Sequence, residues 1–196
     1  MKNKMSVLAV AILFVFSSCQ KQDIEKDLLE AATTKSAQIE APNEQEAATK
    51  SFRQAVLNFR THLSGDEEVP PAETDATGQA TFQLSRDGET LSYRLIVANI
   101  ENVRMAHIHF GGAGVNGPVV VWLYPSAPPP VPIPGRTNGI LAQGVITADN
   151  LVGPLAGASD LSGLIDLIIS GETYVNVHTD QFPGGEIRGQ IFGNVR

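Results

Sequence analysis

Two histidines placed two residues apart, His107 and His109, are the residues of this chain whose types and spacing are best suited to chemistry. The segment around them, residues 105–110, reads MAHIHF. Successive side chains of a β-strand point to opposite faces, so the two imidazoles share one face and the apolar side chains lie on the other. The segment therefore predicts a strand with one face on the core and one face available for polar groups.

A second strand of the same kind is expected at residues 174–179, which read YVNVHT. Its valines form an apolar face, while Tyr174, Asn176 and His178 share the polar one. If the two polar faces meet, three imidazoles converge. Neutral imidazole is a good ligand for Cu and Zn, and a metal held by three protein ligands often keeps a further position open. His107, His109 and His178 are therefore the candidate metal ligands.

The alternative is that these histidines are structural and hydrogen-bond to the backbone, to Asn176 or to Glu186 without a metal. Glu68 precedes two prolines, so its backbone is restrained, and we expect its carboxylate to accept a hydrogen bond from an imidazole and fix its tautomer. Glu186 and Arg188 lie two apart on one strand and are expected to pair with each other or with the histidine cluster.

No catalytic residue can be assigned from the sequence. No serine lies in a nucleophile elbow, and the single cysteine, Cys19, precedes the folded part. The fourth histidine, His62, is expected at the surface. The formal net charge of −7 disfavours a nucleic-acid partner, because the chain has no basic patch with which to neutralise phosphates.

The N-terminus has the pattern of an export signal. Two early lysines are followed by an apolar run over residues 5–16, which is too short to span a bilayer and fits a signal-peptide core. Cys19 follows two serines directly after this run. This resembles the lipobox of bacterial lipoproteins, with Phe16 where leucine is usual. The resemblance implies a signal peptide over residues 1–18 and lipidation of Cys19, and so attachment to a membrane through lipid chains.

Residues 19–57 are then expected to be the lipidated cysteine followed by a disordered tether. They are rich in Gln, Glu, Lys, Ala and Thr and sustain no apolar stripe. These features place the expected location in the bacterial cell envelope, at the outer membrane, either facing the periplasm or exposed on the surface.

The folded domain is expected at residues 58–196, where short apolar–polar alternations are separated by Gly, Pro, Asn and Asp. Strands are expected at residues 58–63, 78–84, 90–98, 104–110, 119–124, 142–147, 174–179 and 186–192. Residues 125–139 contain six prolines and are expected to be an irregular loop. Ser159 or Asp160 is expected to cap one short helix that ends near Ile169. The pattern predicts an all-β fold, an antiparallel Greek-key-like sandwich or barrel of about eight strands.

Five motifs in a fixed order identify the domain as similar to a known family. They are LSG with EVPP (residues 63–71), AHIH (106–109), GPVV (117–120), YVNVHT (174–179) and GGEIRGQ (184–190). This order resembles the CHRD family, named after repeats in the animal protein chordin and common in exported bacterial proteins. The resemblance covers residues 59–192 and implies an extracellular β domain. It leaves the biochemical role open.

A second and more distant likeness is to the copper/zinc superoxide dismutases, which place a His-x-His pair on a strand of a Greek-key barrel. His107 and His109 match that pair, and His178 is placed to match a further ligand. Those enzymes also need a bridging histidine, zinc ligands and a disulfide. His62 lies in no matching motif, and one cysteine forms no internal disulfide. These departures disfavour dismutase activity and leave it uncertain whether the chain is an enzyme at all.

Two hypotheses follow from the sequence. The first is a lipid-anchored, non-enzymatic domain of the cell envelope that binds a protein or another envelope ligand at a histidine-lined site. The second is a protein that binds Cu or Zn through His107, His109 and His178, with the metal structural, handled as cargo, or redox active as in the superoxide dismutases. The oligomeric state is not indicated by the sequence.

Overall fold

The computed structural model describes residues 58–193, so the expected signal peptide, Cys19 and tether lie outside the described residues. Eight strands make one sheet, and the prediction of an all-β fold with one short α-helix is confirmed. The strands are β1 (Asn58–Ser64), β2 (Thr77–Leu84), β3 (Leu91–Phe110), β4 (Val119–Tyr124), β5 (Ile133–Ile146), β6 (Thr173–Thr179), β7 (Ile187–Gln190) and β8 (Phe192–Gly193). The helices are α3 (Ser162–Ile169) and the short 3₁₀ turns η1 (Gly65–Glu67), η2 (Ala148–Asn150) and η3 (Gly153–Leu155).

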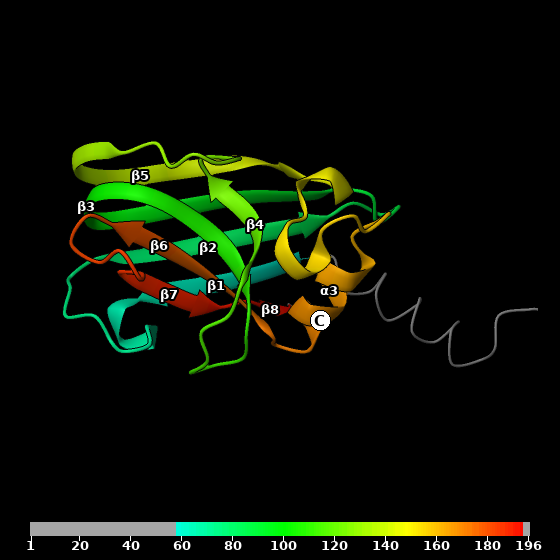
Figure 1. Ribbon diagram of the computed structural model, residues 1–196, viewed down its shortest axis with the longest axis horizontal. Helices are drawn as coiled ribbons and strands as arrows, with labels where there is room; N and C mark the ends of the chain where they lie inside the picture. Colours follow the sequence, from blue (N-terminus) through cyan, green and yellow to red (C-terminus); the bar gives the residue numbers. More distant parts are fainter. Residues whose placement is uncertain (1–57, 194–196) are drawn as a thin grey trace, which may run out of the picture. The chain divides into compact units, whose positions relative to one another are not determined.

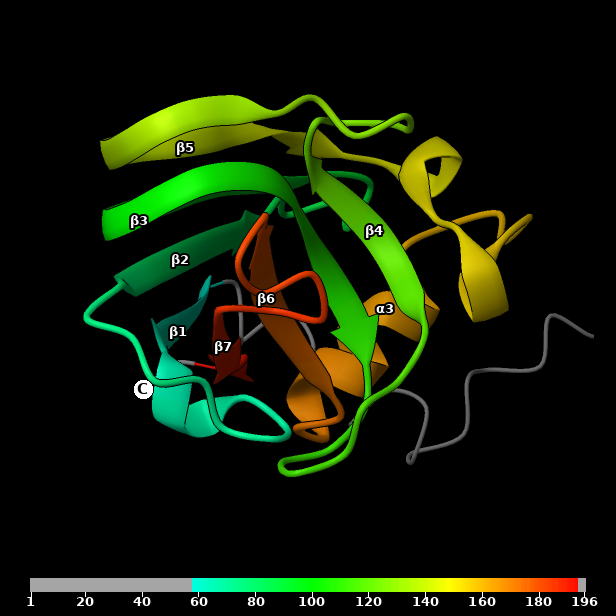
Figure 2. The same ribbon diagram turned by 60° about the vertical axis from the view of Figure 1, so that its left-hand side comes forward.

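Five of the strands close into a barrel. The neighbour order β2-β1-β7-β6-β3 returns to its start because β3 also pairs with β2, and all of these pairings are antiparallel. Figure 1 shows the strands side by side, and Figure 2 shows how β3 curves from one side of the barrel to the other. Closure leaves β4 and β5 as additional partners of β3, and β8 as an additional partner of β1.

Strand β3 is a single strand of 20 residues, where the sequence analysis expected two separate strands. Its first half pairs with β2 and β5, and its second half with β6 and β4. Between the halves, Asn99 and Asn102 have positive φ angles of 58° and 53°. Asparagine tolerates this left-handed conformation better than most residues, so the strand bends at these positions while its pairing continues. The bend brings the histidine half of β3 onto β6.

Strand β5 corrects a second expectation. Residues 125–139 were expected to form an irregular loop, yet β5 begins at Ile133 and continues to Ile146. Proline is tolerated there because β5 pairs with β3 along one edge only, and a residue on the other edge needs no backbone N–H for a neighbouring strand. The glycines at 135 and 139 have positive φ, and the register with β3 shifts three times. These irregularities hide the period of two that would have revealed the strand.

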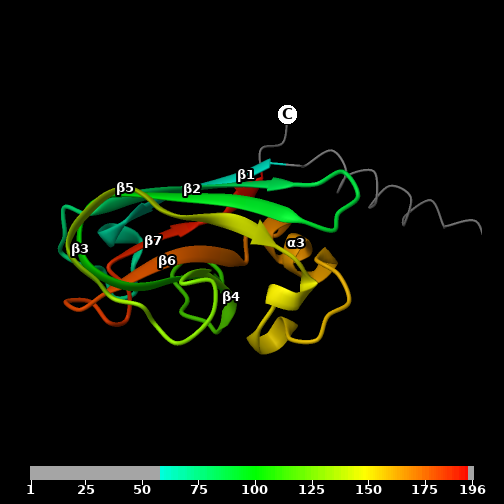
Figure 3. The same ribbon diagram turned by 90° about the horizontal axis from the view of Figure 1, so that it is seen from above.

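The hydrophobic core lies inside the barrel and continues onto α3. Alternation along β2 is complete, with every second residue buried, and Ala106 and Ile108 of β3 are fully buried in the same core. Leu164, Ile165 and Ile168 of α3 join it, and Figure 3 shows α3 at one end of the strands. The helix begins one residue later than the expected caps allow, and the Ser162 amide donates to Asp160 Oδ1. No helix within residues 58–193 is long and apolar enough to cross a bilayer.

Candidate functional site

The polar faces of β3 and β6 meet, as the spacing of the histidines predicted. Antiparallel pairing places His107 opposite Asn176 and His109 opposite Tyr174. The rows continue outward, because Trp122 of β4 pairs with His107 and Arg188 of β7 pairs with Asn176. Directly opposite residues share a face of the sheet, so each row presents its side chains together. The sheet therefore carries a cluster of imidazole, amide and guanidinium groups on the face that points away from its apolar core.

The three candidate histidines come together. One nitrogen of each ring can be chosen so that all three lie within 4.8 Å of one another. The ring centroid of His107 lies 5.4 Å from that of His109 and 5.0 Å from that of His178. All three side chains are buried, with exposed fractions of 2%, 8% and 6% for His107, His109 and His178. Two nitrogens that share one ion with bonds of about 2 Å lie at most about 4 Å apart, so the rings must move closer by about 1 Å to bind a common ion.

Backbone carbonyls fix the orientation of two of the rings. His109 Nδ1 donates to Gly117 O at 2.8 Å, and His178 Nδ1 donates to Pro183 O at 2.9 Å. A carbonyl oxygen only accepts, so the proton of each neutral ring must lie on Nδ1 and the lone pair on Nε2. Both rings are thus held in the tautomer in which Nε2 carries the lone pair, the usual arrangement for a ligating histidine.

The third ring closes the cluster. His107 Nδ1 lies 3.1 Å from His178 Nε2. Since His178 Nε2 carries a lone pair, His107 Nδ1 donates to it in the metal-free protein. The edge of the Trp122 ring packs against the same imidazole, with centroids 4.3 Å apart. The hydrogen bond holds two nitrogens at nearly the separation that two ligands of one metal ion would have.

The buried rings are neutral at physiological pH. Burial lowers the pKa of His107 to about 3, with further lowering from the neighbouring His178 and His109. Burial lowers the pKa of His178 to about 4, although its hydrogen bond to Pro183 O opposes the shift. The pKa of His109 is also lowered, chiefly by burial. Metal binding requires the unprotonated ring, so the site is already in its binding form.

A stack of rings supports His109 from the side. The Tyr174 ring lies parallel to it, with centroids 4.9 Å apart and an interplanar angle of 10°. On the tyrosine lies the Arg188 guanidinium, 3.4 Å from the ring centroid. The Tyr174 hydroxyl accepts from the Gly117 amide, whose own carbonyl holds His109. One aromatic side chain therefore fixes both the ring and the loop that orients it.

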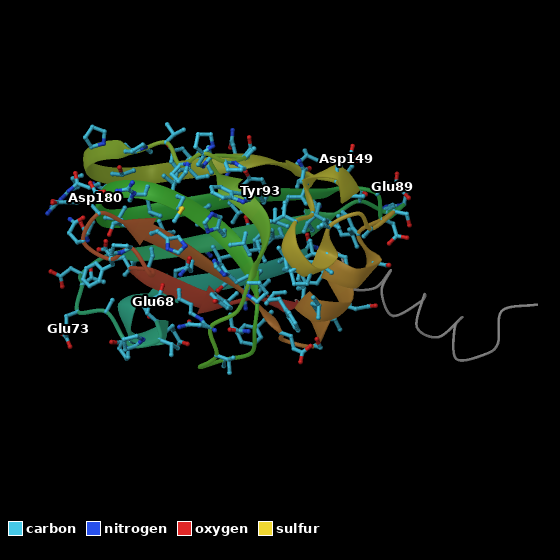
Figure 4. All side chains as sticks on the ribbon, viewed as in Figure 1. Glu68, Glu73, Glu89, Tyr93, Asp149 and Asp180 are labelled. Carbon is cyan, nitrogen blue, oxygen red and sulfur yellow. The ribbon has the colours of Figure 1, made fainter. Side chains whose placement is uncertain are left out.

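Glu68 has a different role from the one expected. It follows η1 beside β7 (Figure 4), and its Oε1 accepts a hydrogen bond from Asn176 Nδ2 at 3.2 Å rather than from an imidazole. Burial raises the pKa of Glu68 to about 7, while the charge of Arg188 opposes the shift. The tautomers are fixed instead by the carbonyls of Gly117 and Pro183. Glu68 thus orients Asn176 and does not touch the rings through a hydrogen bond.

Two glycines allow this close packing. A Cβ on Gly185, whose φ is 136°, would overlap the carboxyl of Glu68 and the amide of Asn176. A Cβ on Gly117 would overlap the carbonyl oxygen of Phe110. Side chains at either position would displace the loops that cover the rings.

Glu186 and Arg188 are both buried but form no salt bridge with each other among the described residues. Glu186 accepts hydrogen bonds from the hydroxyls of Thr74 and Thr179. Arg188 donates to Gly112 O, Val115 O and Asn116 Oδ1. The two therefore do not pair with each other, and Arg188 meets the histidine cluster through the Tyr174 ring. His62 is exposed, as expected.

Unpartnered polar atoms gather at this site. Within residues 58–193, four buried side-chain nitrogen or oxygen atoms have no hydrogen-bond partner, and three of them are His107 Nε2, His109 Nε2 and Asn176 Oδ1. The Asn176 amide cannot be flipped to remove the third, because its Nδ2 also faces Gly184 O, which only accepts. Buried polar groups without partners are rare and costly, so these three atoms are available to a further group such as a water molecule or an ion.

The sequence reasoning missed the second layer of the site. It did not assign roles to Gly117 or Pro183, and it gave Tyr174 only a place on the polar face. The glycine-rich segment 111–117 and the PGG segment 183–185 were visible as loops. Which carbonyl would meet which ring depends on how those loops fold over the sheet, and no residue pattern specifies that.

Comparison with known proteins gives one match. The family model of the CHRD domain matches residues 59–191. Neither the curated proteins nor the solved structures gave a match.

Proposed function

Because the chain belongs to the CHRD domain family, we propose that it is a non-enzymatic binding protein of the cell envelope whose ligand is a transition-metal ion, copper or zinc, held by His107, His109 and His178. This proposal combines the two hypotheses from the sequence, since it keeps the non-enzymatic binding protein of the first and takes the metal ion of the second as its ligand. The observation that supports it is the convergence of three buried imidazoles, two of which, together with the neighbouring Asn176, carry an unpartnered buried atom.

The donor set suits such an ion. Each ring offers a neutral nitrogen, and two of the rings have their other nitrogen held by a backbone carbonyl. This second layer fixes ligand orientation in known metal sites and contributes to affinity there. Copper and zinc both accept three imidazoles, whereas hard ions such as Mg²⁺ and Ca²⁺ prefer oxygen donors.

The purely structural alternative leaves two buried nitrogens without a protein partner. A structural histidine cluster would be expected to satisfy its buried nitrogens, as most proteins do. Here the rings of His107 and His109 each leave Nε2 without a partner in a buried environment. Each such atom costs about 1–3 kcal/mol, which a bound ion would recover.

Attachment to the membrane is proposed through Cys19. The apolar run followed by Ser-Ser-Cys supports lipidation of this residue, and the long polar segment that follows supports a tether between the membrane and the domain. Incorporation of a radiolabelled fatty acid by the expressed chain, and its loss in Cys19→Ser, would be the expected result. Equal labelling of both would contradict the anchor.

The test of the metal site is a titration of the full chain in a Cys19→Ser background, which removes the only thiol that would itself bind copper or zinc. We expect one equivalent of Cu or Zn to bind, and each of His107→Ala, His109→Ala and His178→Ala to weaken binding by at least about tenfold. His62→Ala is the matched control, because His62 is exposed and outside the cluster. Failure of the parent chain to bind either metal at near-stoichiometric concentration would refute the proposal.

A further inference from the structure

The residue that most constrains the charge of this site is Arg188. Its side chain is 1% exposed, and its guanidinium donates only to neutral acceptors, two backbone carbonyls and the Asn116 amide oxygen. Among residues 58–193, no carboxylate lies within salt-bridge distance of it. The protein therefore contains a buried positive charge that no directly paired anion neutralises.

This charge lies one aromatic ring away from a candidate ligand. The guanidinium carbon of Arg188 lies 3.4 Å from the centroid of the Tyr174 ring, and the same ring stacks on that of His109 with centroids 4.9 Å apart. Any cation bound at His109 Nε2 is therefore repelled by this charge across the Tyr174 ring.

The donors do not compensate this charge. The cluster contains three neutral imidazoles and no carboxylate. Glu68 is the acidic side chain with a marked electrostatic interaction with Arg188, and burial keeps its carboxyl only partly ionised near neutral pH. A bound ion would thus keep its full charge in a buried pocket next to a guanidinium. The cost of burying an ion and the repulsion from a neighbouring charge both increase with the charge of the ion.

We propose that the site selects copper(I) over copper(II) and other divalent ions, and that Arg188 is the residue that sets this selectivity. This inference rests on the proposed function. Copper(I) has a single charge and is satisfied by three nitrogen donors, so it avoids half of the repulsion and needs no further ligand. A divalent ion meets twice the repulsion and commonly completes its coordination with water, for which the buried cluster leaves little solvent access.

The test compares the affinities for copper(I) and copper(II) of the full chain, in the Cys19→Ser background, with those of Arg188→Met. Methionine keeps an unbranched side chain of moderate length and removes the charge. We expect the ratio of copper(I) to copper(II) affinity to fall by about tenfold, which lowers the one-electron reduction potential of the bound copper by about 59 mV. Arg94→Met is the matched control, because Arg94 is exposed on the other half of β3.

The outcomes separate this inference from the proposed function. If neither oxidation state of copper nor zinc binds, the metal site itself fails. If metal binds through the histidines but the ratio is unchanged in Arg188→Met, only the selectivity is overturned. Should Arg188→Met not fold, Arg188→Lys keeps the charge and is expected to keep the ratio, whereas a tenfold fall would overturn the inference. A reduction potential of the parent site at or below that of aqueous copper would overturn it as well.

Discussion

Metal affinity at this site should depend only weakly on pH between 7.5 and 5.5. A proton and a metal ion compete for the same nitrogen lone pair, so affinity falls only as the pH falls through the pKa of the metal-free ring. The pKa values of His107 and His178 are lowered to about 3 and about 4, and that of His109 is lowered as well. The rings of His107 and His178 therefore remain unprotonated throughout this range, and the ring of His109 is protonated less than an ordinary histidine.

The size of the difference from an ordinary site can be calculated. A ring with an unperturbed pKa of about 6.5 is protonated about ten to one at pH 5.5, so it loses about tenfold in apparent affinity on going from pH 7.5 to 5.5. Three such rings together would lose about a thousandfold. A ring with a pKa of about 4 is only about 3% protonated at pH 5.5, which changes the affinity by well under twofold.

Zinc is a suitable probe because it has no redox chemistry. Its affinity can be measured by competition with a chromophoric chelator whose own pH dependence is calibrated separately, with circular dichroism recorded at each pH to show that the fold persists. We expect the apparent zinc affinity to change by less than about tenfold, because His107 and His178 contribute almost nothing and the lowered pKa of His109 limits its share to less than that of one ordinary ring. A loss approaching a thousandfold would show that the rings are exposed and titrate normally, and would refute the buried geometry described above.

Three further predictions concern the loops around the rings, the core and Glu68. Gly117→Ala should lower zinc affinity by at least about tenfold and destabilise the fold by about 2 kcal/mol, because the new Cβ overlaps the Phe110 carbonyl. The control is Gly112→Ala in the same loop, where a Cβ meets open space. Titration and melting experiments should show no change in either quantity for this control. Tyr93→Phe should cost about 1–2 kcal/mol in urea denaturation, because the buried hydroxyl donates to Leu123 O at 2.8 Å. Burial raises the pKa of Glu68 from 4.5 to about 7 in the folded protein, so ionisation of its carboxyl lowers the free energy of unfolding as the pH rises through this window. The free energy of unfolding of Glu68→Gln should therefore rise by about 2.5 kcal/mol relative to that of the parent between pH 5 and pH 8. A difference between the two proteins that stays the same at both pH values would contradict the shift.

The histidine cluster could be predicted from sequence because it depends on a strict local rule. Side chains alternate along a strand, so His107 and His109 had to share a face, and the same rule placed His178 with Asn176. The rule does not specify that the two faces would meet. That followed from the antiparallel pairing of β3 with β6, which the structure supplies.

The parts that could not be predicted depend on tertiary contacts. The role of Glu68 was misassigned because its restrained backbone was known but its partner, Asn176, was not. Glu186 and Arg188 share a sequence spacing that favours pairing, yet loops bring threonine hydroxyls to the former and backbone carbonyls to the latter. A polar side chain takes whichever partner the fold brings near, and spacing along one strand does not identify it.

Strand boundaries failed for a different reason. Glycines with positive φ and three shifts of register interrupt the alternation in β5, so its first half has no visible period. In β3 the opposite error arose, since Asn99 and Asn102 have the composition of a turn but bend a continuous strand. Local propensity identifies the irregular backbone at such residues but not whether pairing continues across it.

The central claim, that three histidines converge on one metal ion, is tested most directly by X-ray absorption of the metal-loaded chain in the Cys19→Ser background. We expect a coordination shell of three imidazole nitrogens at about 2.0 Å, reduced to two in His178→Ala and unchanged in His62→Ala. A shell dominated by oxygen with fewer than two imidazoles, or a parent chain that retains no metal to measure, would contradict the account.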